Sequence, residues 1–198
     1  LELNGTPCLP LEEERADRQQ LIFSRSFSVP VTTAAEMRQV MSIYAQQAAS
    51  RLQREHQQAR VLTAYAGTSH FSHKAASFPS ITVKLQSPTS DPVVLTRAAV
   101  GALEDQIVEG IPYTKAGVML SGLSDAGAQP VFDAFVPDQE HRNLGELLGK
   151  VADKYGSASI GLGVAGMPSA RPEWTMSRKF SSPRYTTVWD ELPVVKAR

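Results

Sequence analysis

The sequence predicts an α+β fold with the element order β-α-β-β-α-β over residues 21–125, followed by a smaller α/β region. Three observations lead to this prediction. Four short segments alternate apolar and polar side chains, as half-buried strands do. Two longer segments carry apolar residues at helical spacing. Helix-capping residues and a helix-ending glycine lie at the boundaries between these segments.

The first predicted strand is "LIFSRSFSVPV", residues 21–31. Its odd positions are mostly apolar, and its even positions carry the serines Ser24, Ser26 and Ser28. The exception is Arg25, which lies between Phe23 and Phe27 on the apolar side. Strict alternation turns Arg25 inward. Two interpretations therefore stay open: a buried ion pair, or a local twist or bulge that brings Arg25 to the serine face.

The first predicted helix lies within residues 32–58. Thr33 and Glu36 form the pattern of a capping box at its start. The apolar residues that recur at helical spacing are Met37, Val40, Met41, Tyr44, Ala48 and Leu52. This pattern is typical of an amphipathic helix with one face packed on a sheet.

Two strands follow, over residues 59–69 and 79–88. In the first of them, "ARVLTAYAGTS", two alternations fit equally well. In the second, "PSITVKLQSP", the residues predicted to face inward are Ile81, Val83 and Leu85. The residues predicted to face outward are Thr82, Lys84 and Gln86.

The second predicted helix spans residues 91–110, with Asp91 as its cap, Pro92 in its first turn and Gly110 at its end. The last strand, residues 113–123, turns Ala116, Val118 and Leu120 inward. The complete order is ferredoxin-like: a four-stranded antiparallel sheet with both helices on one face. Nothing within residues 21–125 covers the other face of the sheet.

The C-terminal region has a weaker pattern. Residues 141–155 predict a short amphipathic helix through Leu144, Leu147, Leu148 and Val151. Residues 157–166 and 173–180 predict a small β element.

Bulk composition excludes several classes of protein. The chain has 198 residues, of which 42% are hydrophobic, enough for one domain and a small appendage. No apolar run approaches the roughly 20 residues of a membrane helix, so no membrane contact is expected. Cys8 is the single cysteine, which excludes an intrachain disulfide and favours the cytoplasm.

The charges are sorted although the net charge is zero, with 20 basic and 20 acidic residues. The predicted strands and their connections carry Arg25, Arg60, Lys74, Lys84 and Lys115. All acids between residues 21 and 124 lie on the helices or their caps. A basic sheet with many hydroxyl groups is suited to a phosphate backbone. No aromatic cluster interleaves these strands, so base stacking of the RNA-recognition type is poorly supported.

Other motifs carry little weight. "GLGVAG", residues 161–166, matches a dinucleotide fingerprint, but prolines follow it where a helix is required. His70 and His73 lack the further ligands that zinc needs, so no metal site is predicted. The serines lie in no recognisable nucleophile elbow, and an independent enzyme has no residue constellation behind it.

Several motifs resemble a known family. "SRSFS", "TSHFS", "VKLQSPT", "YTKAGVML" and the terminal "WTMSRKFSSPRYTTVWDELPVV" are similar to the little-finger domain and tail of Y-family translesion DNA polymerases, in the UmuC-type branch. The resemblance spans essentially the whole chain. It implies a thumb-to-little-finger linker at 1–20, the little finger at 21–125, a second linker at 126–140 and a UmuC-type tail at 141–198.

The resemblance also implies a role, in which the sheet grips primer–template DNA during error-prone lesion bypass. The expected DNA-binding residues are Ser24, Arg25, Ser26, Ser28, Thr68, Ser69, Lys74, Thr82, Lys84 and Lys115. The palm, which would hold Mg²⁺ in the parent polymerase, is absent from this sequence. Neither a cofactor nor polymerase activity is therefore expected of this chain alone.

In this family a sliding-clamp motif follows the little finger. One alignment places it on Val131, Phe132, Asp133, Ala134 and Phe135. Another begins it at Gln129, with Phe132 or Phe135 as the anchor. The alternative is a linker whose phenylalanines pack on the tail.

Further partners implied by the resemblance are a UmuD-like accessory dimer and RecA, for a monomeric fragment in the cytoplasm at the nucleoid. The alternative function is a protein-interaction module that docks the accessory subunit or clamp and contacts DNA only weakly. Salt dependence separates the two functions.

Overall fold

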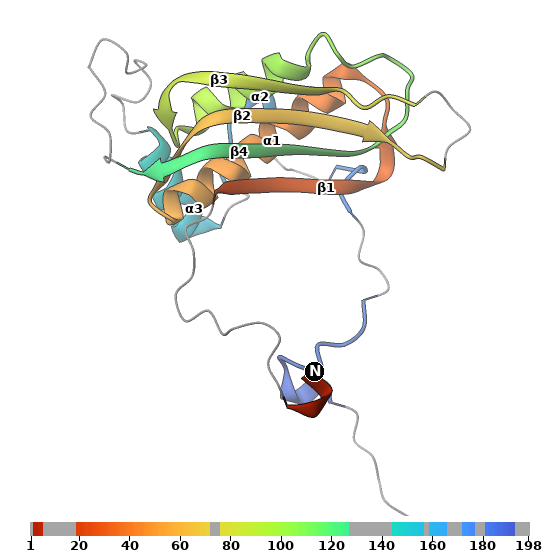
Figure 1. Cartoon of the computed structure of the whole chain (residues 1–198), viewed down its shortest axis with the longest axis vertical. Coiled ribbons are helices and arrows are strands. Elements are labelled where there is room, and N and C mark those ends of the chain that lie inside the picture. Colours follow the sequence, from red (N-terminus) through yellow and green to blue (C-terminus); the bar gives the residue numbers. More distant parts are fainter. Residues whose placement is uncertain are drawn as a thin grey trace, which may run out of the picture.

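The computed structural model of the chain contains the predicted order of strands and helices (Figure 1). It describes residues 2–5, 19–71, 76–126, 144–156, 159–165, 172–176 and 181–192. The strands and helices are β1 (Gln20–Val31), α1 (Ala34–Arg54), β2 (Gln57–Thr68), β3 (Ser80–Thr89), α2 (Pro92–Leu103), β4 (Tyr113–Asp125) and α3 (Leu144–Tyr155). Short 3₁₀ turns are η1 (Glu2–Asn4), η4 (Gly163–Ala165) and η5 (Trp189–Glu191).

The four strands form one antiparallel sheet in the order β1-β4-β2-β3. Because β1 and β2 both pair antiparallel with β4, they run parallel to each other with β4 between them. Likewise β2 separates β3 from β4. Each β-α-β unit is therefore split by a strand of the other unit. Helices α1 and α2 both lie on one face of the sheet, as predicted (Figure 1).

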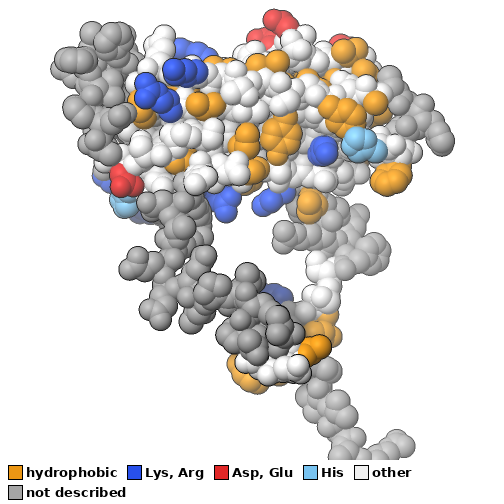
Figure 2. All heavy atoms as spheres, viewed as in Figure 1, with side chains coloured by type: hydrophobic (Ala, Val, Ile, Leu, Met, Phe, Trp, Pro, Cys, Tyr) orange, Lys and Arg blue, Asp and Glu red, His pale blue; other side chains and the backbone are white. Residues whose placement is uncertain are grey.

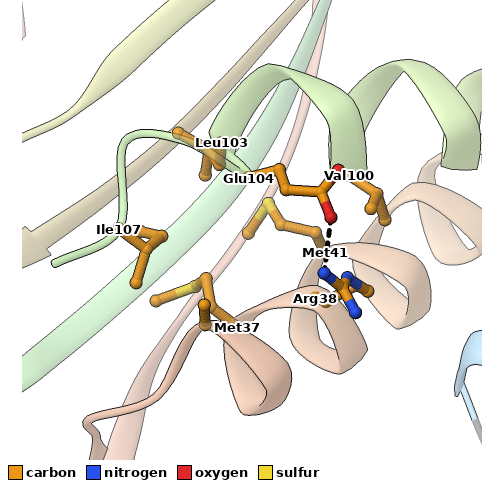
Figure 3. A pocket seen from close by; sticks show the side chains of 8 residues that line it. Met37, Arg38, Met41, Val100, Leu103, Glu104 and Ile107 are labelled. Atoms are coloured by element: carbon orange, nitrogen blue, oxygen red, sulfur yellow. Dashed lines mark hydrogen bonds and ion pairs between the residues drawn. The ribbon is translucent and has the colours of Figure 1, made fainter. Parts of the chain in front are cut away.

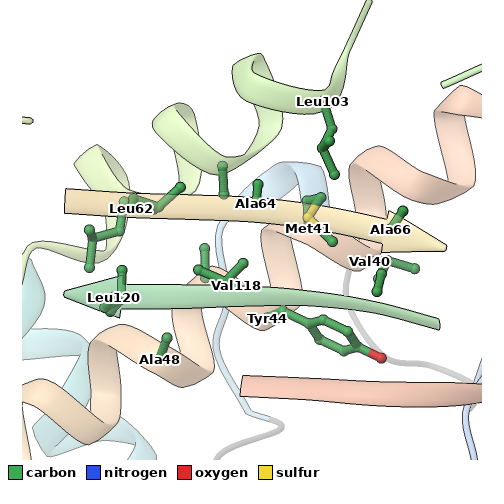
Figure 4. Close-up of a cluster of buried hydrophobic side chains, with 14 of the residues drawn as sticks. Val40, Met41, Tyr44, Ala48, Leu62, Ala64, Ala66, Leu103, Val118 and Leu120 are labelled. Atoms are coloured by element: carbon green, nitrogen blue, oxygen red, sulfur yellow. The ribbon is translucent and has the colours of Figure 1, made fainter. Parts of the chain in front are cut away.

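The core lies between this face and the two helices (Figure 4). All six apolar residues predicted from the helical spacing of α1 are buried. On the sheet side, the inward residues of β4 are fully buried, as predicted: Ala116, Val118 and Leu120. Strand β2 turns Leu62, Ala64 and Ala66 inward, which resolves the two alternations that its sequence allowed. Each fully buried Leu or Val contributes about 1.5–3 kcal/mol to folding.

Helix α1 begins with a variant of the predicted capping box. The Glu36 N–H donates to Thr33 Oγ1 at 3.2 Å. The Glu36 carboxylate accepts from the backbone N–H of Thr32 at 3.3 Å, one residue before the usual partner. Both side chains thus satisfy backbone N–H groups at the helix start, as the sequence indicated.

Helix α2 begins as predicted but ends earlier. Asp91 Oδ1 accepts from the N–H groups of Val93 and Val94 at 2.7 and 3.0 Å. The prediction that Gly110 ends the helix is wrong, because α2 stops at Leu103. The chain then turns, and Ile107 and Ile111 still pack against the core. Gly110 has φ of +82° and its N–H donates to Thr32 O.

Described parts of the C-terminal region pack against α1. Helix α3 is confirmed. The described residues within 157–166 and 173–180 contain no strand, so the predicted β element is not found there. Side chains of α1 bind their backbone instead: Gln39 Nε2 donates to Ala165 O, and Gln46 Oε1 accepts from Leu162 N. Among the described residues, no helix combines the length and the apolar character needed to cross a membrane.

Candidate nucleic-acid interface

The face of the sheet that points away from α1 and α2 is not covered by any described element (Figure 1). Strand pairing arranges its side chains in rows that cross the sheet. The rows are Gln20–Ser121–Val61–Lys84, Ile22–Met119–Thr63–Thr82, Ser24–Gly117–Tyr65–Ser80, and Ser26–Lys115–Gly67. We call these residues the open face. Five predicted DNA-binding residues belong to it: Ser24, Ser26, Thr82, Lys84 and Lys115.

A tyrosine completes the third row. A Cβ atom at Gly117 would lie 2.5 Å from Tyr65 Oη and 2.6 Å from Ser24 Cβ. The Tyr65 side chain therefore lies across β4 above Gly117, and its hydroxyl end comes close to Ser24. The sequence analysis missed Tyr65. A glycine inside an alternating strand signals such a close approach and could have identified it.

Lys115 crosses the neighbouring strand in a similar way. A Cβ atom at Gly67 would lie 2.9 Å from Lys115 Cε and 3.0 Å from Phe78 Cδ1. The aliphatic part of Lys115 thus lies over Gly67, beside the Phe78 ring. Lys84 is exposed near the opposite end of the open face. The Thr63 and Thr82 hydroxyls are 2.9 Å apart and hydrogen-bond to each other.

Acidic residues are scarce on this side. The four strands contain one, Asp125, because β4 extends two residues beyond its predicted end. Figure 2 shows Lys and Arg side chains on this face and Asp and Glu side chains only towards its margins. The predicted sorting of charge therefore holds for the described residues, apart from the end of β4.

Ser28 does not join the open face. The pairing of β1 with β4 shifts between Ser26 and Val31, so alternation fails there. The Ser28 N–H donates to Trp174 O at 3.1 Å. Its hydroxyl lies 2.7 Å from Glu173 O and 2.8 Å from Thr175 O, which share its proton. The prediction that Ser28 contacts a phosphate therefore needs correction, because backbone groups of residues 173–175 already bind this serine.

Arg25 lies on the helix side of β1. Its partner across the sheet is Ala116, which faces the core. The side chain is exposed, and its guanidinium carbon lies 5.0 Å from the centre of the Phe23 ring. Both earlier interpretations need correction: Arg25 is not buried, and the bulge comes after Ser26, too late to reverse its direction.

The aromatic residues beside Arg25 are packed edge to face. Tyr44 lies 5.1 Å from Phe23 and 6.2 Å from Trp174, and Phe27 lies 5.9 Å from Trp174, between ring centroids. Burial raises the pKa of the Tyr44 phenol to about 12, and the positive charge of Arg25 partly opposes this shift. We call Phe23, Phe27, Tyr44 and Trp174 the flank cluster.

Two further predicted residues, Thr68 and Ser69, lie where β2 leads into the β2–β3 connection. Thr68 is only 2% exposed, and its hydroxyl accepts from Ser77 N at 3.1 Å. Its burial contradicts a direct role in binding DNA. Ser69 Oγ accepts from Phe71 N at 3.2 Å. Lys74 and the clamp-motif residues Gln129, Val131, Phe132 and Phe135 lie outside the described residues.

Elsewhere, the described residues offer little chemistry. They contain no group of three or more His, Cys, Asp or Glu side chains that could hold a metal ion. A small hollow between α1 and α2 is lined mainly by Met37, Met41, Leu103 and Ile107 (Figure 3). Arg38 and Glu104 form an ion pair beside it and satisfy each other. The hollow therefore carries no candidate site.

Comparison with known proteins identifies the family. The model of the impB/mucB/samB family C-terminal domain matches residues 18–131, and that of a domain of unknown function (DUF4113) matches residues 142–195. Similar curated proteins are ImpB of Salmonella typhimurium (38% identical), UmuC of Salmonella typhimurium strain LT2 (37%) and MucB of Escherichia coli (33%). Each alignment covers 98% of this chain and 45–46% of the relative, so the chain spans about half the length of these relatives. The first match includes the whole sheet and both helices that cover it, and the chain therefore belongs to the impB/mucB/samB family.

Proposed function

We propose that this chain is the DNA-binding and regulatory C-terminal region of an error-prone translesion DNA polymerase, and that its open face grips primer–template DNA. One observation carries the proposal. Hydroxyl groups and two lysines line the open face, and none of the residues in its rows is acidic. Family membership supports the same role.

The positions of the two lysines suit a phosphate backbone. Their partners on β2 are Val61 for Lys84 and Gly67 for Lys115, six positions apart. At about 3.3 Å per residue, the two side chains leave the sheet roughly 20 Å apart. That distance matches the axial rise of about six base pairs of a DNA duplex. Lysines at this spacing supply charge, and the hydroxyls of Ser24, Ser26 and Thr82 supply hydrogen bonds between them.

The proposal also covers the parent polymerase and its partner proteins. The parent polymerase would use Mg²⁺ in a palm domain that this sequence lacks. A sliding clamp would take the segment that contains Gln129, Val131, Phe132 and Phe135. A UmuD-like accessory dimer and RecA would bind the parent enzyme at the nucleoid. For this chain alone, we propose DNA binding without catalysis.

Fluorescence anisotropy with a short primer–template duplex, measured across a salt series, tests the DNA grip. Each phosphate contact contributes a slope of about one in the plot of log affinity against log salt. We expect Lys84→Ala and Lys115→Ala each to reduce the slope by about one. Arg97→Ala, at an exposed position on α2, removes the same charge from the helix side and should change the slope far less. Absence of binding at low salt, or an equal effect of all three variants, would refute the proposal.

A second candidate function is a protein-interaction module, favoured by the turn at residues 184–192. Arg184 binds Glu191 through its backbone N–H and its guanidinium, and this contact lowers the pKa of the Glu191 carboxyl. The turn leaves Trp189 85% exposed, beside an exposed Tyr185. Exposed aromatic side chains on an ordered turn are typical anchors in protein interfaces. Binding through them would depend weakly on salt, which distinguishes this function from the DNA grip.

A further inference from the structure

Three aromatic residues lie in the connection from β2 to β3. The His70 imidazole stacks on the Phe78 ring, with centroids 4.6 Å apart and planes inclined by 19°. Phe71 is 96% exposed and Phe78 is 44% exposed. Figure 2 shows hydrophobic side chains and a histidine together at one end of the face. We call His70, Phe71 and Phe78 the aromatic corner.

The aromatic corner is continuous with the open face. Phe78 and the aliphatic part of Lys115 meet above Gly67, where both approach the position of a missing Cβ atom within 2.9–3.0 Å. Ser26 lies opposite Lys115 on β4's other neighbour, β1. A ligand stacked on the corner would thus have a lysine and a serine within reach. No described residue of β2, of β3 or of the connection between them is acidic.

Exposed flat rings beside a cation match the chemistry of an unpaired nucleotide. Every base has a π-face that stacks on an aromatic side chain, and the adjoining phosphate needs a positive charge. Paired bases in a duplex hide these faces inside the helix, so a duplex would use the hydroxyls and lysines of the open face but not the rings. An apolar peptide would use the rings but would leave Lys115 without an anionic partner.

We propose that the aromatic corner binds unpaired nucleotides of a DNA strand that continues beyond the duplex on the open face. Bases would stack on Phe71 and on the His70–Phe78 pair, while Lys115 contacts a phosphate. The inference rests on the proposed DNA grip and adds a single-strand site at one end of it. Such a site would place the duplex-to-single-strand junction at the β2–β3 end of the sheet.

The experiment uses the full 198-residue chain and three DNA probes. The first is a blunt duplex, the second is the same duplex with a short single-stranded thymidine extension, tested at either strand end. The third carries an abasic extension of equal length, which keeps the phosphates and removes the bases. We expect the thymidine extension to strengthen binding about tenfold over the blunt duplex, and the abasic extension to do so much less.

Single substitutions test which aromatic ring produces the gain in affinity from the extension. Phe71→Ala should remove most of the gain from the extension and leave blunt-duplex affinity within about twofold, because this ring touches no base of a duplex. Its high exposure means that the substitution removes no packing. Phe78→Leu should act in the same direction. Tyr155→Ala removes an aromatic ring that is 66% exposed on α3 and should leave the gain intact.

A fluorescent base provides an independent readout. With 2-aminopurine in the extension, wild-type protein should change the fluorescence at one or two positions, and Phe71→Ala should abolish that change. If the blunt duplex binds and the thymidine extension adds no more than the abasic one, the single-strand site is refuted while the DNA grip stands. If no probe binds at low salt, both proposals fail.

Discussion

Strand β1 places its three serines in two different environments. Ser24 and Ser26 point to the open face, and their hydroxyls bind no other described residue. Ser28, on the same strand, is held by three backbone groups of the C-terminal segment. The difference arises because β1 departs from β4 after Ser26 and exposes an edge to which residues 173–175 bind. Availability of a polar strand residue therefore depends on what covers the strand edge.

Aromatic residues show the same contrast. The flank cluster is packed edge to face between β1, α1 and the C-terminal segment, with Trp174 only 8% exposed. The aromatic corner is stacked and exposed. The flank cluster therefore stabilises the attachment of the C-terminal segment, whereas the rings of the corner are exposed among the described residues.

Replacing Trp174 should have the largest effect. Trp174→Ala removes the ring that Phe27 and Tyr44 contact and should lower the free energy of unfolding by about 3 kcal/mol. Circular dichroism during chemical denaturation measures this loss. Trp189→Ala, at an exposed position, should cost less than about 0.5 kcal/mol. Equal losses would mean that the C-terminal segment is not attached through Trp174.

The second largest effect should come from alkaline pH, which lowers the free energy of unfolding through the buried phenol of Tyr44. The folded state holds the pKa of Tyr44 at about 12, above its unfolded value of about 10. The neutral phenol therefore contributes stability that is fully present below about pH 10 and is lost as the pH rises to 12. The loss reaches about 2–3 kcal/mol.

Tyr44→Phe keeps the ring and removes the titrating group. The difference in unfolding free energy between wild type and this variant should be constant up to about pH 10 and then change in favour of the variant. A difference that stays constant to pH 12 would contradict a buried phenol. Denaturation at a series of pH values provides the measurement.

Gly117→Ala should perturb the open face. The added methyl group would overlap Tyr65 and Ser24 Cβ, so Tyr65 must swing away, at a cost of about 1–2 kcal/mol. The double variant Gly117→Ala/Tyr65→Ala tests the cause. If the overlap with Tyr65 produces the cost, removing that ring should recover part of the stability, as a double-mutant cycle measures. Strictly additive losses would exclude contact between the two residues.

Two serine variants should have the smallest effects, one on stability and the other on DNA binding. Ser28→Ala removes the hydrogen bonds to Glu173 O and Thr175 O and should cost about 1 kcal/mol of stability, with unchanged DNA affinity. Ser26→Ala should leave stability within about 0.5 kcal/mol and weaken DNA binding a few-fold. Unfolding and anisotropy measured on both variants give the comparison. If Ser28→Ala lost DNA affinity and Ser26→Ala did not, the assignment of Ser26 rather than Ser28 as a DNA contact would be wrong.

Much of the fold could be predicted because it depends on local patterns. The caps at Thr33 and Asp91 lie next to the residues that they bind, and the inward residues of β3, β4 and α1 follow strict periods. The early end of α2 could not be predicted in this way. Leu103, Ile107 and Ile111 keep the four-residue spacing of a helix, so the local pattern favours a longer helix than the structure contains.

The candidate site was predicted in part for the same reason. Ser24, Ser26, Thr82, Lys84 and Lys115 lie on the open face because alternation holds at each of them. Ser28 was misplaced because the register shifts between Ser26 and Val31, and Pro30, which lies in this interval, was not used as a signal of the irregularity. Tyr65 was missed because the residues near its ring belong to other strands, and the aromatic corner because only the fold brings Phe78 to Lys115 over Gly67.

Local sequence patterns specify the order of elements, their inward faces and the separation of charge, because each of these depends on residues within a few positions of one another. Tertiary structure decided the strand order, the side of β1 on which each serine acts, and the meeting of Phe78 with Lys115 over Gly67. It also decided that residues 173–175 bind the edge of β1. These features join residues far apart in the chain, and their free energy depends on packing and hydrogen bonds that exist only once the sheet has formed.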